Sequence, residues 1–451
     1  MKTTILVAVL LAFSALAVSI GNFRESAGVD FYQYWGVAKA QKWRGGKLKS
    51  PYVEPAQYAA VLNAYADGSS DSRLKKVNRI RRELELAQTP LCYAIFAFLP
   101  GNYSLAFGIF QATQIILLLA ATMMLGLSFP GNRTGLLPLA LLLLIFYQPL
   151  LSDLRVGNLD SIQLFALVLL TFFADRVLAG PSGRQPLGYG IIFLGALVFL
   201  TLLKPNLALV TLLLAGTLWI RQGTVVFGRA ALAAACLAVI LLALPCLQFH
   251  SWQVWLDWYR YARGLDAEKL LSFIPYGNHA LVILVAKSLG FGVSGVTALL
   301  AAALVGSGVG ALRLTLPPGR GGLPELGRTA VRSLRDPYLS AALGVTATLA
   351  LAPLVWLHYY VLSLFPALWL LWGRQHWGLA AVAAGFSILL TSGAVSNLLV
   401  ALFGYGPWLP YGYALGWVPL WAGLLAAIAF NQESPLVSDL PVITKNTTAG
   451  V

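Results

Sequence analysis

The chain has 451 residues, of which 58% are hydrophobic and 11% are charged, and its mean hydropathy is +0.75. Soluble domains carry about 25% charged residues, so this composition excludes a chain of ordinary soluble domains and indicates a helical membrane protein. The net charge of +14 does not indicate nucleic acid binding, because Lys and Arg cluster in loops between apolar segments, where they orient a membrane protein and contact anionic headgroups.

Apolar segments of roughly bilayer-spanning length follow one another along the chain. They lie at 3–21, 103–129, 134–151, 158–178, 187–203, 205–220, 228–248, 291–313, 338–356, 359–373, 377–395 and 414–430. We therefore predict an all-α, polytopic integral membrane protein with about twelve spans, a single catalytic domain over 1–430 and a disordered cytoplasmic tail over 431–451. The first segment could instead be a cleaved signal peptide, although we favour a helix. An apolar stretch near 280–290 is short for a span and is predicted to be interfacial or re-entrant.

Short basic loops recur on one side of these segments when Met1 and Lys2 are placed inside. Those loops contain Arg133, Arg176, Arg184, Arg221, Arg229, Arg313, Arg320, Arg328, Arg332, Arg335 and Arg374. This is the bias that orients membrane proteins with their basic loops in the cytoplasm. The extracytoplasmic side then receives a long first loop, 22–102, the segments 152–157, 249–290 and 396–413, and the turns at Lys204 and His358.

Two stretches on that side have helical apolar stripes with basic neighbours, and we predict that both are interfacial helices. The first stripe consists of Leu74, Val77, Ile80 and Leu84, and the second contains Trp252, Trp255 and Trp258. Each stretch could serve as a membrane anchor or form the rim of a cleft for a lipid substrate.

A carboxylate and several aromatic side chains follow the first apolar segment. Asp30 could act as the base for a sugar hydroxyl, and Tyr34 and Trp35 offer flat apolar faces on which a pyranose can stack. The alternative is an aromatic interface belt that includes an incidental Asp.

Two further ionisable residues lie at predicted outer turns. His358 could bind a phosphate or pass a proton, or it could cap a helix end. Lys204 could neutralise a lipid phosphate leaving group, or it could extend its ammonium to the headgroups. Asn158, Asp160 and Asn278 begin apolar stretches on the same side, where they could cap helices or contact a substrate.

The sequence contains no Walker loop, dinucleotide fingerprint or zinc spacing, and no Asp-x-Asp near Asp30. We predict no metal and no cofactor, because a lipid monophosphate needs fewer ligands than a nucleotide diphosphate. Cys92, Cys236 and Cys246 lie in apolar segments and are not spaced like metal ligands.

Several short motifs, taken in order, resemble glycosyltransferase family 87, within the GT-C class of polytopic enzymes that use lipid-phosphate sugars. They are Val29 to Tyr34, Gly45-Gly46 with Pro51-Tyr52, Tyr93 to Pro100, Gly157 to Asp160, Leu203 to Asn206, Gly277 to Leu281, and Pro353 to His358 with Tyr359-Tyr360. The set spans 29–366. The chain departs from the family pattern at Asn158, where Gln is usual, and at Ala280 and Ala352, where Ser is common.

The resemblance implies an inverting transfer of a hexose, mannose being the best-known case, from a polyprenyl-phosphate donor to a glycolipid or glycan acceptor, without a required metal. Asp30 would take the acceptor proton and His358 would lie at the donor phosphate. Lys204 as a second phosphate contact is inferred from its position. Tyr34, Trp35, Asn158, Asn278 and Tyr359 are the expected substrate contacts.

The expected partners are the polyprenyl-phosphate donor, the acceptor and the lipid bilayer, and no nucleic acid. The expected location is the bacterial cytoplasmic membrane, with the active site on its extracytoplasmic face. The alternatives are a transporter or flippase of lipid-linked glycans, or a polymerase or ligase of such glycans. Transporters often contain repeats and broken helices near the bilayer midplane, whereas the charged residues here lie at one surface.

Overall fold

The computed structural model describes residues 14, 21, 26–86, 88–128, 142–176, 187–264, 267–274, 277–316, 322–372, 378–404 and 409–430. All regular secondary structure in these ranges is helical, and an isolated antiparallel bridge pairs Asn278 with Trp356. The prediction of an all-α protein is therefore confirmed for the described part of the chain. The predicted first helix, apart from residues 14 and 21, and the predicted tail lie outside it.

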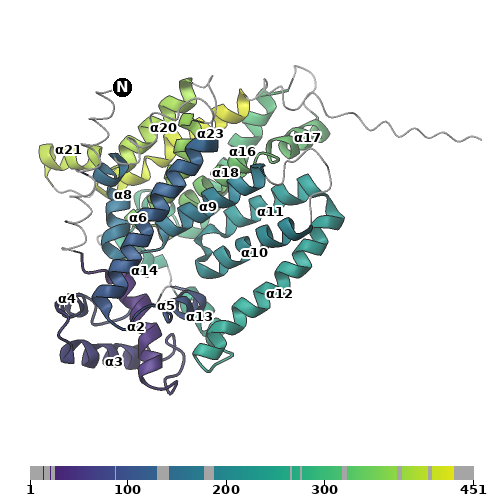
Figure 1. The fold of residues 1–451 in the computed structure, drawn as a ribbon. Coiled ribbons are helices and arrows are strands. Elements are labelled where there is room, and N and C mark those ends of the chain that lie inside the picture. The colour runs from purple at the N-terminus through teal and green to yellow at the C-terminus, as the bar shows by residue number, and fades with distance from the viewer. Residues whose placement is uncertain are drawn as a thin grey trace, which may run out of the picture.

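The predicted first loop is a folded layer of four helices, here called the N-terminal layer, which covers one end of the helical bundle (Figure 1). Its helices are α2 (Val29–Trp43), α3 (Pro55–Gly68), α4 (Ser72–Ile80) and α5 (Pro90–Phe96). Fully buried aromatic side chains form its core, among them Tyr32, Trp35 and Tyr58. This core consists mainly of residues from 26–110, and Leu159, Leu203, Cys246, Phe249 and Val254 of the bundle complete it.

The rest of the described chain forms a bundle of helices of very different lengths (Figure 1). In chain order these are α6 (Tyr103–Ser128), α8 (Gln148–Val156), α9 (Asp160–Arg176), α10 (Leu187–Leu203), the 3₁₀ turn η2 (Pro205–Leu207), α11 (Ala208–Gln222), α12 (Thr224–Gln248), α13 (Val254–Arg263), α14 (Ala267–Ser272), α15 (Leu281–Leu289), α16 (Val293–Leu314), α17 (Leu323–Ser333), α18 (Pro337–Leu351), the 3₁₀ helix η4 (Leu357–Ser363), α19 (Leu364–Trp372), α20 (Gly378–Thr391), α21 (Ala394–Phe403), α22 (Leu409–Ala414) and α23 (Trp417–Ala429).

Four of the described helices are long and apolar enough to cross a membrane: α6, α12, α16 and the Tyr411–Ala429 segment that contains α23. The number rises to six if each of two bent pairs counts as one span. These pairs are α8 with α9, bent by 115°, and α20 with α21, bent by 51°. Three shorter apolar helices, Leu187–Leu203, Pro337–Leu351 and Leu357–Trp372, coincide with predicted spans.

The structure differs from the sequence prediction at two predicted loops. Residues 152–157 belong to α8 and its cap, where Gly157 takes a left-handed conformation and allows the sharp bend into α9. Residues 396–413 include most of α21 and of α22. The short stretch near 280–290 forms the nine-residue helix α15, too short to cross a bilayer.

A helix forms in both predicted stretches, but α4 ends at Ile80, before Leu84, and α13 begins at Val254, after Trp252. Each helix packs part of its stripe into protein, and the interfacial position stays a prediction. Leu74 and Val77 of α4 are buried in the N-terminal layer, whereas Ile80 is 57% exposed. Trp255 and Trp258 of α13 pack against the same core, and Trp252, just before α13, is 77% exposed. Each helix therefore joins the layer and still presents apolar surface outward.

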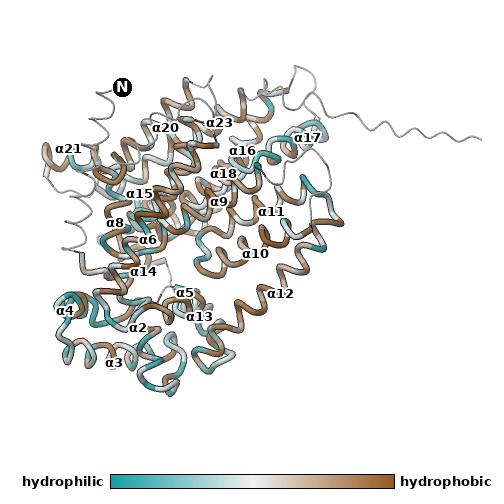
Figure 2. The backbone as a smooth tube through the Cα atoms, in the orientation of Figure 1, coloured by the Kyte–Doolittle hydropathy of each residue, from teal (hydrophilic) through white to brown (hydrophobic). Residues whose placement is uncertain are grey.

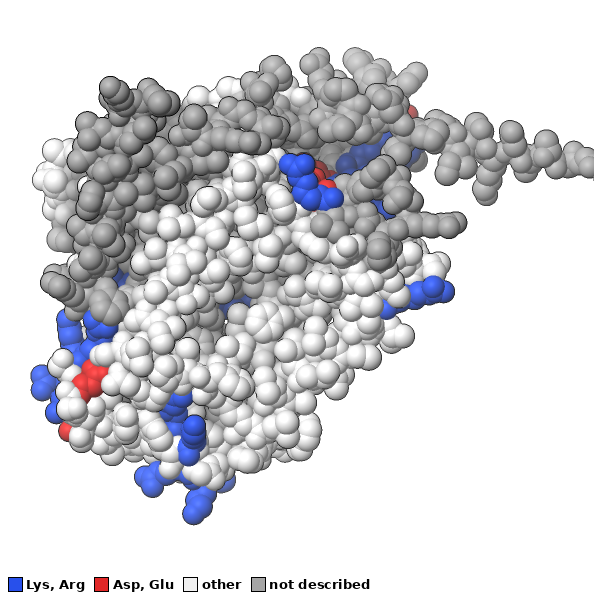
Figure 3. All heavy atoms as spheres, in the orientation of Figure 1, with Lys and Arg blue, Asp and Glu red and all other residues white. Residues whose placement is uncertain are grey.

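Hydropathy also distinguishes the bundle from the N-terminal layer. The bundle is mostly hydrophobic, and polar residues concentrate in the N-terminal layer and α13 and at α17 (Figure 2). On the face seen in Figure 3, Lys and Arg gather at the two edges and a broad band between them is almost free of charged side chains. Such a band is what a bilayer requires of the surface it surrounds.

Arg221 near the end of α11 fixes which helix ends lie together. Its guanidinium donates to the carbonyl oxygen of Ala174 in α9, at 2.6 Å, and to that of Arg335 just before α18, at 2.8 Å. The ends of α9 and α11 and the beginning of α18 therefore lie together at one end of the bundle. The beginning of α9, the end of α10 and the end of α18 lie at the other end. The N-terminal layer is bonded there, because the Thr89 hydroxyl donates to the Leu203 carbonyl oxygen at 2.9 Å. We call this end the layer end.

Candidate active site

Two glycines hold the beginning of α2 against the bend between α8 and α9. Gly28 and Gly157 both have positive φ, 72° and 71°, and the Gly28 amide donates to the Arg155 carbonyl oxygen at 3.2 Å. A Cβ at Gly157 would lie 2.6 Å from the Cβ of Phe31, and a Cβ at Gly28 would lie 2.8 Å from Phe107. Only glycine fits both the dihedral angle and the space, and this close approach brings Asp30 to Asn158.

A chain of short hydrogen bonds links four polar side chains at the layer end. The Asn158 amide donates to Asp30 Oδ2 at 2.6 Å, and its Oδ1 accepts from Lys204 Nζ at 2.7 Å. Lys204 Nζ also donates to Asp160 Oδ1 at 2.7 Å. Asn158, Asp160 and Lys204 are almost completely buried. We call these three residues, with Asp30 and His358, the polar cluster.

His358 completes the cluster from η4. Its Nε2 lies 3.9 Å from Asp30 Oδ2 and 3.8 Å from Asp160 Oδ2, which is too long for a hydrogen bond. Among the described residues, His358 Nε2 and Asp160 Oδ2 are buried and have no hydrogen-bond partner. Buried polar atoms without a partner are costly and uncommon. Their convergence with Asp30 defines a point at which a hydroxyl group could meet two carboxylates and an imidazole.

The ammonium of Lys204 is engaged on three sides. It bonds Asn158 and Asp160 and lies 4.2 Å from the centre of the Tyr359 ring, a cation–π distance. The prediction that Lys204 extends to the headgroups does not describe this geometry, because its side chain is 3% exposed. In this arrangement Lys204 orients Asn158 and neutralises Asp160.

Asp153 supports the cluster from behind. Its carboxylate accepts hydrogen bonds from the hydroxyl and the amide of Ser161 and from the amide of Asp160, so Asp153 caps α9. Gln114 of α6 donates both to Asp153 Oδ2 at 3.2 Å and to the Asn158 carbonyl oxygen at 2.7 Å. The cap that we predicted at Asn158 or Asp160 is therefore supplied mainly by Asp153, which frees the other two side chains for the cluster.

Tyr34 and Trp35, the two aromatic residues that we predicted to act with Asp30, have different surroundings in the structure. Tyr34 is buried on the same helix, and its hydroxyl accepts from Gln88 at 3.3 Å. Trp35 is completely buried, its indole donates to the Pro100 carbonyl oxygen at 2.9 Å, and its ring contacts Trp43 and Tyr103. Trp35 therefore belongs to the core of the N-terminal layer and presents no face for a sugar.

Asn278 uses both ends of its amide within the protein. Its Oδ1 accepts from the amides of Ala280 and Val355, and its Nδ2 donates to the carbonyl oxygens of Leu270 and Pro353. These bonds tie the segment before α15 to the segment that leads into η4. Asn278 therefore fixes the position of His358 through the backbone and is completely buried.

Burial raises the pKa of Asp30, and the hydrogen bond from Asn158 and the charges of Arg81 and Lys204 oppose that rise. Arg81 follows α4 and pairs with Glu85 at 2.8 Å, and its side chain is 27% exposed. The Glu85 amide donates to Gln33 Oε1 at 2.6 Å, which holds this basic segment against α2. Arg81 is thus a partly exposed cation close enough to influence the Asp30 carboxylate.

Three residues near the polar cluster were not predicted from the sequence: Asp153, Gln114 and Arg81. The structure also shows that Asp160 Oδ2 has no hydrogen-bond partner among the described residues. Both acids lie at the edges of apolar segments, Asp153 just after 134–151 and Asp160 at the start of 158–178, and an ionisable residue in such a place is a functional signal. Within the described ranges no three His, Cys, Asp or Glu side chains are grouped as metal ligands, and the three cysteines are unpaired.

Comparisons with protein-family models, with curated proteins and with solved structures give no match. The chemistry of the polar cluster is therefore the basis for the function. Asp30 is a partly exposed carboxylate near the imidazole of His358, and Lys204 is a buried cation next to both acids of the cluster. Such a set can accept a proton from a hydroxyl group and hold a polar group in place.

Proposed function

We propose that the chain is an inverting membrane glycosyltransferase that moves a hexose, mannose in the first instance, from a polyprenyl-phosphate donor to a glycolipid or glycan acceptor. The observation that carries the proposal is the convergence of Asp30, Asp160 and His358 at one end of an apolar helical bundle. A lipid carrier in the bilayer presents its headgroup at the end of such a bundle. The hydroxyl group of a sugar acceptor needs a base, and a carboxylate of the cluster can supply it.

Asp30 is the better base of the two acids. Its side chain is 17% exposed and can meet an acceptor, whereas that of Asp160 is 0% exposed and its Oδ1 is held by Lys204. Asn158 donates to Asp30 Oδ2, which keeps the carboxylate in one orientation. Orientation of the reacting groups supplies a large part of catalysis in a displacement of this kind.

In the proposed reaction the acceptor oxygen attacks C1 of the donor sugar and its proton passes to the Asp30 carboxylate. The new C1–O bond forms as the bond from C1 to the phosphate oxygen breaks. The electron pair of that bond leaves with the polyprenyl phosphate. A single displacement of this kind inverts the configuration at C1, and Asp30 then releases its proton to water.

The leaving phosphate needs donors. His358 Nε2 has no partner among the described residues, which suits it to a phosphate oxygen. Lys204 Nζ uses two of its three N–H donors on Asn158 and Asp160, which leaves one for a phosphate oxygen. Arg81, which is partly exposed and near Asp30, is a further cation that can reach a phosphate at the entrance.

The proposal includes the architecture and topology predicted from the sequence: about twelve spans in a GT-C-like arrangement, in a bacterial cytoplasmic membrane, with the N-terminal layer outside. The layer end is then the extracytoplasmic end, and the donor reaches it from the outer leaflet. The basic loops on the opposite side support this orientation.

The test uses the full chain in proteoliposomes with radiolabelled polyprenyl-phosphate mannose and a lipid extract. We expect label to move into a new product with the unmodified chain, and we expect Asp30→Asn to lose transfer while it still inserts and folds. Asp67→Asn is the matched control, because Asp67 is an exposed carboxylate of the same layer. Full activity of Asp30→Asn would refute the assignment of the base. Label that crosses the bilayer on an unchanged lipid would favour a transporter or flippase.

A further inference from the structure

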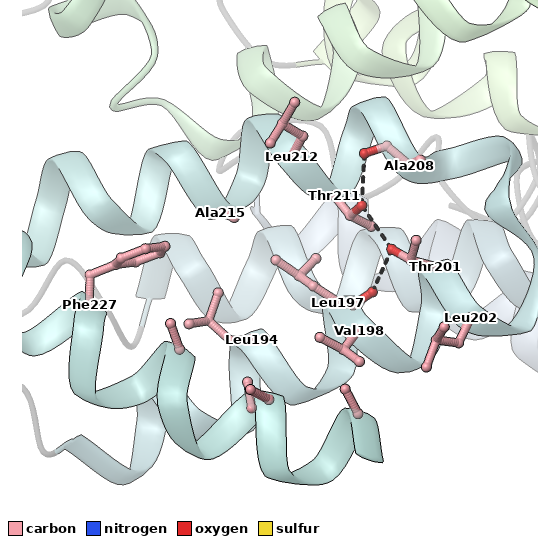
Figure 4. A pocket seen from close by; sticks show the side chains of 14 residues that line it. Leu194, Leu197, Val198, Thr201, Leu202, Ala208, Thr211, Leu212, Ala215 and Phe227 are labelled. Carbon is pink, nitrogen blue, oxygen red and sulfur yellow. Dashed lines mark hydrogen bonds between the residues drawn. The ribbon is translucent and has the colours of Figure 1, made fainter. Parts of the chain in front are cut away.

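An apolar groove runs along the outside of the bundle between α10, α11 and α12 (Figure 4). Its volume is about 480 Å³. Helix α10 forms the floor through Leu197 and Val198, and α11 and α12 form the two walls (Figure 4). Leu212 of the α11 wall is 68% exposed, so the groove is open to the surroundings of the bundle along its side.

The groove exists because α12 approaches α10 closely and leaves α11 apart. Glycines on α10 permit this approach: a Cβ at Gly195 would lie 2.8 Å from Leu237, and one at Gly190 would lie 3.2 Å from the Cβ of Ala230. The α12 wall is then made of small side chains, among them Ala234 and Ala238. Small residues on a wall leave the space that larger ones would fill.

The chemistry of the lining selects a hydrocarbon. Of the side chains that line the groove, only Thr201 and Thr211 are polar, and their hydroxyl oxygens lie 2.9 Å apart in a hydrogen bond. The Thr201 hydroxyl also lies within hydrogen-bond distance of the Leu197 carbonyl oxygen and the Thr211 hydroxyl of that of Ala208, as the dashed lines in Figure 4 mark, and the two hydroxyl protons form two of these three bonds at a time. Because both hydroxyls already have partners within the protein, the lining offers few hydrogen bonds to a sugar or a phosphate.

The position of the groove connects it to the polar cluster. It follows α10 from Leu194 to Leu202, a rise of roughly 12 Å, and ends two residues before Lys204. Lys204 is the buried cation of the cluster. A lipid that lies in the groove with its anionic end toward the layer end therefore places that end beside the segment that carries Lys204.

We infer that this groove holds the polyprenyl chain of the donor lipid, an inference that rests on the proposed function and assigns the lipid part of the same substrate. The chain enters from the side between α11 and α12, and its phosphate-proximal isoprene units lie beside Thr201 and Ala238. Burial of this part of the chain selects long polyprenyl carriers over short ones, and it leaves the sugar to the polar cluster.

The test compares Ala238→Phe, which fills the groove, with Val239→Phe, whose side chain is 65% exposed on the same helix. With the full chain in nanodiscs, Ala238→Phe should raise KM for a long-chain polyprenyl-phosphate mannose by roughly 10-fold or more. KM for a donor of two isoprene units should stay within about twofold, and Val239→Phe should change neither value. An equal loss for both donors, or no loss for either, would overturn the inference.

A binding measurement separates this inference from the proposed function. A long-chain polyprenyl phosphate without a sugar, which carries a photoreactive group near its phosphate end, should label α10, α11 or α12 of the unmodified chain. Unlabelled polyprenyl phosphate should compete, and phosphatidylglycerol should not. Labelling without any sugar transfer would retain the groove and reject the transferase. Labelling elsewhere, or competition by phosphatidylglycerol, would show that bulk lipid occupies the groove and would reject the inference.

Discussion

Replacement of Asn158 by Leu is the sharpest perturbation of the polar cluster. The Asn158 side chain donates to Asp30 at 2.6 Å and accepts from Lys204 at 2.7 Å, and both partners are charged groups. Leucine has nearly the same size but makes neither bond. A hydrogen bond to a charged group contributes about 1.5–3 kcal/mol, so the loss of the bond that orients Asp30 predicts a roughly 10- to 100-fold fall in kcat/KM.

The pH dependence gives a second readout with a defined sign. Asp30 acts as a base only when it is ionised, so the rate falls as the pH drops through its pKa. Burial raises the pKa of Asp30 and the bond from Asn158 opposes that rise. Asn158→Leu removes the opposing bond, so the acidic limb of the kcat/KM profile should move to higher pH.

The assay is transfer from radiolabelled polyprenyl-phosphate mannose over a range of pH, together with thermal unfolding of the purified variant. Asn206→Leu is the matched control, because Asn206 lies at the same end of the bundle and exchanges its amide bonds with Gln163. Its pH profile should not move. A profile for Asn158→Leu that coincides with that of the unmodified chain, at a rate within about twofold, would refute the proposed orientation of Asp30.

Three further predictions test the supports of the site. Gly157→Ala should lower both the thermal midpoint and the transfer rate, because the φ of Gly157 is 71° and an added Cβ would clash with Phe31. Gly216→Ala is the control and should change neither quantity, since a Cβ there has no atom within 4 Å; equal effects of the two variants would contradict the prediction. Lys204→Met should destabilise the fold by about 3–5 kcal/mol, since it leaves Asp160 buried without its cation, and Lys204→Met with Asp160→Leu should recover thermal stability without activity. Trp35→Phe should cost about 1 kcal/mol in unfolding measurements and leave the acceptor KM unchanged; an increase in that KM would restore the sugar-stacking role.

Sequence alone determined where most of the apolar helices lie. Runs such as 103–129, 187–203 and 291–313 correspond to α6, α10 and α16 within a few residues, because a bilayer fixes both the length and the composition of what crosses it. Alternation of these runs also predicted that Asp30, Lys204 and His358 share one end of the protein. The structure brings all three into the polar cluster, and their roles in transfer stay a prediction.

Only the tertiary structure decided which polar groups serve the site and which serve the fold. Trp35 and Asn278 looked like substrate contacts, yet their hydrogen bonds hold the N-terminal layer and the segment before η4. Asp160 looked like a helix cap, yet Asp153 takes that part and Asp160 pairs with Lys204. The partner of a buried polar side chain depends on which distant segment approaches it. Close approaches, such as that between the segments of Gly28 and Gly157, result from packing in three dimensions. Hydropathy and residue spacing along the chain contain no information about that packing.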